Sequence, residues 1–225
     1  MADPVGHITG RQLRMPRAAA FAGVIFAFLF ACSYFMIFRW APEERGDLAV
    51  WLARHGQTAS LGVGLLPFAG IAFIWFMAVL RDTIGYFEDQ FFSTLFLGSG
   101  FLYLALTFMG AATAHGALSI FALDPELATR DASFEIARAI SAQSMTLYAM
   151  RMAGMFALVL GTIWMRTALM PRWLVICTYV TALTLLFSLG YNRWLVMVFP
   201  CWVFVVSIVV LLRNYRQSGR DDPAA

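Results

Sequence analysis

Residues 59–80 read ASLGVGLLPFAGIAFIWFMAVL, a run of 22 positions without a charged side chain. The hydrocarbon core of a bilayer is about 30 Å thick, and a helix of about 20 apolar residues crosses it. The chain contains five further apolar runs, one before this stretch and four after it, each flanked by arginine, aspartate or glutamate. We therefore expect an all-α membrane protein, a bundle of six transmembrane helices over residues 18–38, 59–80, 92–116, 143–165, 173–191 and 195–212.

The composition agrees with a chain whose main solvent is lipid. Hydrophobic residues make up 61% of the 225 positions and charged residues only 13%, so we expect one transmembrane domain over residues 1–225. The net charge of +3 comes from arginines near the ends of the apolar runs, which predicts no nucleic-acid partner. The absence of lysine and the abundance of alanine favour a GC-rich bacterium, and hence the bacterial inner (cytoplasmic) membrane.

The arginines also predict an orientation, because cytoplasmic segments of membrane proteins are enriched in basic residues. With the N-terminus inside, the inner segments contain nine arginines: Arg11, Arg14, Arg17, Arg81, Arg166, Arg172, Arg213, Arg216 and Arg220. The outer segments contain six: Arg39, Arg45, Arg54, Arg130, Arg138 and Arg193. Both termini are therefore expected in the cytoplasm.

The two longer outer loops carry helix signals. Asp47 is a suitable cap for a short amphipathic helix that ends at Gly56 and lies flat on the membrane. In the second loop Asp124-Pro125 predicts another helix start, and from Ala132 the pattern continues into the run 143–165. The other connections are short, so we expect three antiparallel neighbouring pairs: the second helix with the third, the fourth with the fifth, and the fifth with the sixth.

Arg151 is the one charged residue well inside an apolar run, and no aspartate or glutamate lies in any of the six runs. An arginine at the centre of a membrane helix costs about 2.5–3.5 kcal/mol on insertion scales, so it usually faces the bundle interior and meets a partner. That partner is a backbone carbonyl, a hydroxyl, water, an acid from a loop or an anionic ligand.

Two polar stripes at helical spacing indicate where such a ligand would bind. One comprises Ser141, Ser144, Tyr148 and Arg151, and the other comprises Ser99, Tyr103, Thr107, Gly110 and Ala114. If the stripes face each other they form a polar seam, in which Arg151 binds a carboxylate or phosphate and the tyrosines orient it. Alternatively, the small and hydroxylated residues only pack the helices together.

Metal or haem binding has weaker support. His55 and His115 are expected on the same side of the membrane, but no set of four ligands at metal spacing exists. Cys32, Cys177 and Cys201 are odd in number and lack a C-x-x-C pair, so no disulfide framework or thiol metal site is expected. No cofactor is indicated, and protease, lipase and phosphate-loop motifs are absent.

Several phrases of the sequence resemble an uncharacterised bacterial six-helix integral-membrane protein family with no established activity. The phrases are PFAGIAFIWF (67–76), EDQFF (88–92), FLGSG (96–100), YAMRM (148–152), MPRW (170–173) and FPCW (199–202). The resemblance includes Arg151, but it implies no catalytic residue.

Three hypotheses of function follow. The first is a non-enzymatic membrane protein that binds or transports a small anionic or amphiphilic molecule at the polar seam. The second is an accessory or scaffold subunit, or a homo-oligomer, in which Arg151 and the helix around Trp51 contact partner chains. The third is a haem-containing redox protein that uses His55 and His115.

Overall fold

The computed structural model describes residues 16–37, 45–84, 90–123, 132–188 and 194–218, and nearly all of these residues are helical. The helices are α1 (Pro16–Ile37), α2 (Arg45–Ile84), α3 (Gln90–Leu123), α5 (Ala132–Gln143), α6 (Ala149–Thr167), α7 (Arg172–Phe187) and α8 (Leu195–Ser218). A π-helix, η1 (Ser144–Tyr148), joins α5 to α6 without a break. The described residues thus form six continuous helical rods.

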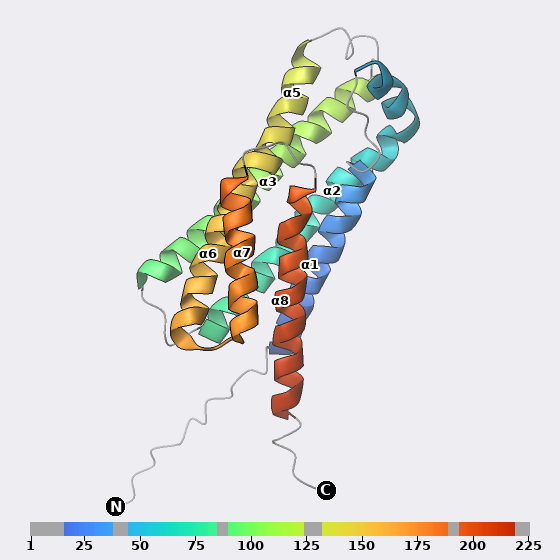
Figure 1. The fold of residues 1–225 in the computed structure, drawn as a ribbon. Coiled ribbons are helices and arrows are strands. Elements are labelled where there is room, and N and C mark those ends of the chain that lie inside the picture. Colours follow the sequence, from blue (N-terminus) through green and yellow to red (C-terminus); the bar gives the residue numbers. More distant parts are fainter. Residues whose placement is uncertain (1–15, 38–44, 85–89, 124–131, 189–193, 219–225) are drawn as a thin grey trace, which may run out of the picture.

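Successive rods run in opposite directions (Figure 1). The starts of α1, α3 and α7 lie at the same end of the bundle as the last turns of α2, α6 and α8. We call this end the terminal end, and the other the opposite end. The predicted antiparallel neighbours are confirmed, since α2 contacts α3, α6 contacts α7, and α7 contacts α8.

Four segments among the described residues are long and apolar enough to cross a membrane: Val50–Arg81, Gln90–Leu123, Ala132–Thr167 and Leu195–Arg213. Phe21–Ile37 and Arg172–Phe187 are shorter apolar helices. Large apolar side chains are exposed around the bundle, among them Phe28, Trp75 and Ile176. Such a surface is expected of a protein whose outer face contacts lipid.

The predicted short helix that ends at Gly56 is wrong as a separate, flat element. Instead α2 is one helix of 40 residues that runs through Gly56 and Pro67. A glycine inside a helix costs only about 1 kcal/mol relative to alanine, so packing can override it as a stop signal. The predicted continuation from Ala132 into the fourth rod is confirmed by α5, η1 and α6. The predicted helix start at Asp124-Pro125 lies outside the described residues.

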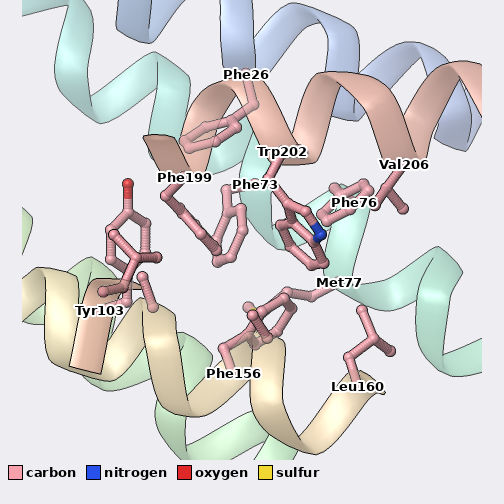
Figure 2. Packing of buried hydrophobic residues seen from close by; sticks show 14 of the residues in the cluster. Phe26, Phe73, Phe76, Met77, Tyr103, Phe156, Leu160, Phe199, Trp202 and Val206 are labelled. Atoms are coloured by element: carbon pink, nitrogen blue, oxygen red, sulfur yellow. The ribbon is translucent and has the colours of Figure 1, made fainter. Parts of the chain in front are cut away.

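A cluster of aromatic rings from five rods fills the centre of the bundle (Figure 2). The ring centroid of Phe73 on α2 lies 5.0 Å from that of Phe26, 5.5 Å from that of Phe156 and 5.6 Å from that of Phe199. Tyr103 of α3 lies beside Phe199, with centroids 4.8 Å apart. In lipid such rings gain little from the hydrophobic effect, so close packing must hold the rods together.

Glycines bring the rods close enough for that packing. A Cβ atom at Gly110 on α3 would lie 3.1 Å from the carbonyl oxygen of Ser141. A Cβ at Gly154 on α6 would lie 3.1 Å from the carbonyl oxygen of Ala182 on α7. At both positions backbone meets backbone, which only a residue without a side chain permits.

A second, smaller cluster lies away from this centre, where α2 begins and α3 ends. Leu52 and Phe121 are buried there, with Trp51, Leu118 and Phe134 packed against them. At 1.5 Å per residue, the 34 residues of α3 extend about 51 Å, well beyond the roughly 30 Å of a bilayer core. These rods are therefore longer than one membrane crossing requires. The second cluster joins α2, α3 and α5 in the part beyond that length.

Candidate functional site

The three polar residues predicted on α3 are all buried. Ser99 and Thr107 use their hydroxyl groups within their own helix: Ser99 donates to the carbonyl oxygen of Leu95 (2.6 Å), and Thr107 donates to that of Tyr103 (2.8 Å). Both hydroxyls are therefore satisfied without a ligand, as expected of residues that pack helices in a membrane.

Tyr103 differs from its two neighbours on α3. Its side chain is fully buried, yet its hydroxyl has no hydrogen-bond partner among the described residues. The ring packs edge-on against Phe73, with centroids 5.2 Å apart. A buried hydroxyl without a partner costs about 1–3 kcal/mol. The Tyr103 hydroxyl is therefore a buried polar group in the aromatic centre, as the hydroxyl of Ser33 is on α1.

The second predicted stripe divides into two halves at the π-helix. Ser141 and Ser144 are buried, whereas Tyr148 is 52% exposed and Arg151 is partly exposed. Within η1 the backbone N–H of Ala149 bonds to the carbonyl oxygen of Ser144, five residues earlier. A π-helical turn contains more residues than an α-helical turn, and such turns recur at functional sites.

The structure thus places the two predicted tyrosines in different environments. Tyr103 lies in the aromatic centre, whereas Tyr148 lies on the outer surface of its rod. The two predicted stripes meet where Gly110 approaches the backbone of Ser141, but the two tyrosines differ in burial, 0% exposed for Tyr103 against 52% for Tyr148. Whether Arg151, Tyr148, Ser144, Tyr103, Thr107 and Ser99 bind a ligand stays a prediction.

Arg151 lies at the edge of the contact between α6 and α7. Three residues further along α6, Gly154 packs against α7. No hydrogen bond or ion pair joins the guanidinium of Arg151 to any residue that the structure describes. The side chain is only partly covered, so it remains accessible from the surface of the bundle.

An amphipathic strip begins at Arg151 and follows this edge of α6. Arg151, Met155, Leu158 and Thr162 recur at steps of four, three and four residues, and all four are partly exposed. We call these residues the α6 strip. At its other end the hydroxyl of Thr162 donates to the carbonyl oxygen of Leu158 (2.9 Å) and lies 3.2 Å from the hydroxyl of Tyr179 on α7. The strip therefore has a cation at one end, a polar pair at the other and two apolar side chains between them.

The direction of α6 determines where the guanidinium points. Side chains of an α-helix tilt toward its N-terminus, and α6 begins toward the opposite end of the bundle. Arg151 lies 15 residues before Arg166, which corresponds to about 22 Å along the helix axis. A long arginine side chain can thus place its charge toward the opposite end of the bundle while its methylene groups stay in lipid.

The two histidines considered as metal ligands, His55 and His115, are both exposed. The ring of His55 stacks on Trp51, with centroids 5.3 Å apart, and its Nδ1 atom lies 3.2 Å from the Trp51 carbonyl oxygen. His115 is exposed on α3. Within the described residues no group of three or more histidine, cysteine, aspartate or glutamate side chains is placed to hold a metal. Cys32, Cys177 and Cys201 are free thiols.

Sequence reasoning missed two features of this region. The π-helix is formed by SMTLY (144–148), in which nothing distinguishes it from an ordinary helical turn. The α6 strip does have helical spacing in the sequence, but the stripe predicted from hydroxylated residues ends at Arg151 and leaves out Met155 and Leu158. Comparison of the chain with models of protein families, with curated proteins and with solved structures found no match.

Proposed function

We propose that this chain is a non-enzymatic protein of the bacterial inner membrane that binds an anionic amphiphile along the α6 strip. Arg151 binds the anionic head group, and Met155 and Leu158 contact the apolar chain. The observation that carries the proposal is the partly exposed guanidinium of Arg151, which has no acidic or hydrogen-bonding partner among the described residues. A guanidinium in lipid requires a negative or polar partner.

The proposal includes six membrane crossings with both termini in the cytoplasm. The alternating directions of the rods support it, as does the excess of arginine at the segments assigned to the inside. The 22 residues of α1 extend about 33 Å, enough to cross a bilayer core. The 16 residues of α7 extend about 24 Å, so α7 crosses only with help from adjoining residues or local thinning of the bilayer.

The structure supports an amphiphile over a small soluble anion. A soluble anion would need an enclosed polar cavity, whereas the two predicted stripes pack directly against each other, since a Cβ at Gly110 would lie 3.1 Å from the carbonyl oxygen of Ser141. An amphiphile instead reaches Arg151 from within the bilayer, with its chain already in lipid. The geometry of the α6 strip therefore supports binding. For transport, the adjoining π-helix is the place where α5 and α6 would rotate relative to each other.

The test compares oleate with oleyl alcohol, which differ in charge at the head group. Native mass spectrometry of the protein from mild detergent would count the molecules retained by the wild type and by Arg151→Met. We expect the wild type to retain oleate in preference to oleyl alcohol, and the variant to lose that preference. Arg138→Met is the matched control, because Arg138 lies on the same rod but pairs with Glu135 at 3.2 Å. Equal retention of oleate by the wild type and Arg151→Met would contradict the proposal.

A second function, an accessory subunit of a larger membrane complex, has one observation in its favour. Leu123 and Ile136 are exposed near the second cluster, where α3 and α5 extend beyond one crossing. Exposed apolar side chains outside the hydrocarbon would be covered by a partner chain. This function predicts a fixed stoichiometric partner that is lost with Leu123→Glu. A chain that runs alone in mild detergent would count against it.

A further inference from the structure

An open groove of about 470 Å³ lies at the terminal end, far from Arg151. The segment between α6 and α7 contributes Met170 and Pro171, the first turn of α7 contributes Trp173, and the last turns of α8 contribute Val209, Leu212 and Arg213. We call this the α7–α8 groove. The distance along α6 from Arg151 to Thr167 is about 24 Å, so the groove is separate from the α6 strip.

The backbone of the connecting segment shapes the groove. Beyond the last residue of α6, Ala168 adopts a left-handed conformation (φ 50°, ψ 23°), which ends the helix. Pro171 is extended, and its carbonyl oxygen accepts the N–H groups of Leu174 (2.9 Å) and Val175 (3.3 Å), so α7 begins at a fixed point. The chain therefore turns within four residues and leaves space beside α8.

Arg213 is held at the mouth of the groove by this turn. Its Nη1 atom donates to the carbonyl oxygen of Leu169 and lies 3.5 Å from the sulfur of Met170. A guanidinium has five N–H donors, so most of them remain for another acceptor. No carboxylate pairs with Arg213 among the described residues.

The walls of the groove are apolar, and this decides which kind of anion fits. Val209, Leu212 and Met170 line it, and the half-exposed indole of Trp173 lies at its edge. Indole rings favour the level of lipid head groups, and basic pockets between helices on the cytoplasmic side bind anionic head groups. A soluble phosphate would satisfy Arg213 but leave the apolar walls uncovered.

We propose that the α7–α8 groove binds one anionic phospholipid, with its phosphate on Arg213 and an acyl chain against Val209 and Leu212. The site is independent of the ligand at Arg151. Only its assignment to the cytoplasmic leaflet rests on the proposed orientation.

The experiment measures retained lipid by native mass spectrometry, with phosphatidylglycerol and phosphatidylcholine as the two probes. We expect wild type to retain one phosphatidylglycerol in preference to phosphatidylcholine. Arg213→Gln should bind phosphatidylglycerol about fivefold more weakly, which corresponds to the contribution of about 1 kcal/mol from one arginine near anionic lipid. Arg172→Gln is the matched control, since it removes the same charge beside the groove without lining it, and it should retain the lipid.

A second variant is needed because Arg213→Gln also removes the contact with Leu169, and a misfolded variant would lose the lipid for that reason alone. Val209→Phe keeps Arg213 but fills the groove, and it should also lose the bound lipid. Arg151→Met should retain it, so failure of the function proposed for Arg151 would leave this result unchanged. Equal loss with Arg172→Gln and Arg213→Gln, equal retention of the two lipids, or displacement of the lipid by inorganic phosphate would each overturn the proposal.

Discussion

Trp202 on α8 donates a hydrogen bond of 3.0 Å from its indole Nε1 to the Oγ1 atom of Thr178 on α7. Thr178 in turn donates to the carbonyl oxygen of Leu174 (2.8 Å), and both side chains of the pair are buried. The two bonds give the hydroxyl of Thr178 one donor and one acceptor role, which satisfies the buried indole N–H completely. They join α8 to α7 in a region where most contacts are apolar.

Replacing Thr178 with valine should destabilise the bundle. The substitution keeps the shape of the side chain but leaves the indole N–H of Trp202 buried without an acceptor, at a cost of about 1–3 kcal/mol. Thr178→Ser should retain most of the stability, because it keeps the hydroxyl. Thermal unfolding in mild detergent, followed by tryptophan fluorescence, would measure both variants. If valine and serine have the same effect, the hydrogen bond does not contribute.

Gly23→Ala should also destabilise the protein, by about 1–3 kcal/mol, because the added methyl group overpacks the contact between α1 and α8. A Cβ at Gly23 would overlap the hydroxyl of Ser207 and lie 2.7 Å from the ring of Phe76. Gly64→Ala is the control, since nothing lies within 4 Å of a Cβ at that position. The same unfolding assay should show a loss for Gly23→Ala and none for Gly64→Ala.

Tyr103→Phe should not reduce stability, although Tyr103 is one of the most buried residues. The hydroxyl that it removes has no partner in the described residues, so its loss relieves a cost and leaves the ring contacts in place. Tyr103→Ala, by contrast, should cost several kcal/mol through the cavity that it creates, about 3–5 kcal/mol for a large aromatic residue. A clear loss with phenylalanine would mean that the hydroxyl binds a water molecule or a ligand.

The proposed topology predicts the activity of reporter fusions. Green fluorescent protein joined after Ala225 should fluoresce, and alkaline phosphatase inserted between α1 and α2, within residues 38–44, should be active, because the first reporter works in the cytoplasm and the second outside it. The reverse pair of fusions, with the reporters exchanged, should be inactive. An active phosphatase after Ala225 would contradict the cytoplasmic C-terminus.

The helical nature of the chain could be predicted because lipid leaves few alternatives. Uncharged runs such as residues 59–80 must satisfy their backbone groups internally, which in a single segment only a helix does. The end of a helix is harder to predict. Gly56 is a valid stop signal, but the contact of Leu52 with Phe121 keeps α2 helical there, and that contact joins residues far apart in the sequence.

The candidate site could be predicted only in part, for a related reason. Helical spacing shows which residues share a face, but it does not show which neighbour that face contacts. Tyr103 and Tyr148 belong to stripes of equal regularity, yet the first lies in the aromatic centre and the second faces outward. The five residues of the π-helix also rotate the residues that follow them about the helix axis. A pattern with a period of 3.6 residues does not predict that rotation.

The contact between α1 and α8 has a consequence for how the protein is made. Phe26 meets Phe199 with ring centroids 6.3 Å apart, and Tyr34 meets Trp194 at 6.2 Å, so α1 packs against a helix that is synthesised long after it. During translation α1 is therefore made well before its partner, and the aromatic centre closes only after Leu195–Ser218 has left the ribosome. A chain that stops before α8 would leave the face of α1 around Phe26 and Tyr34 uncovered.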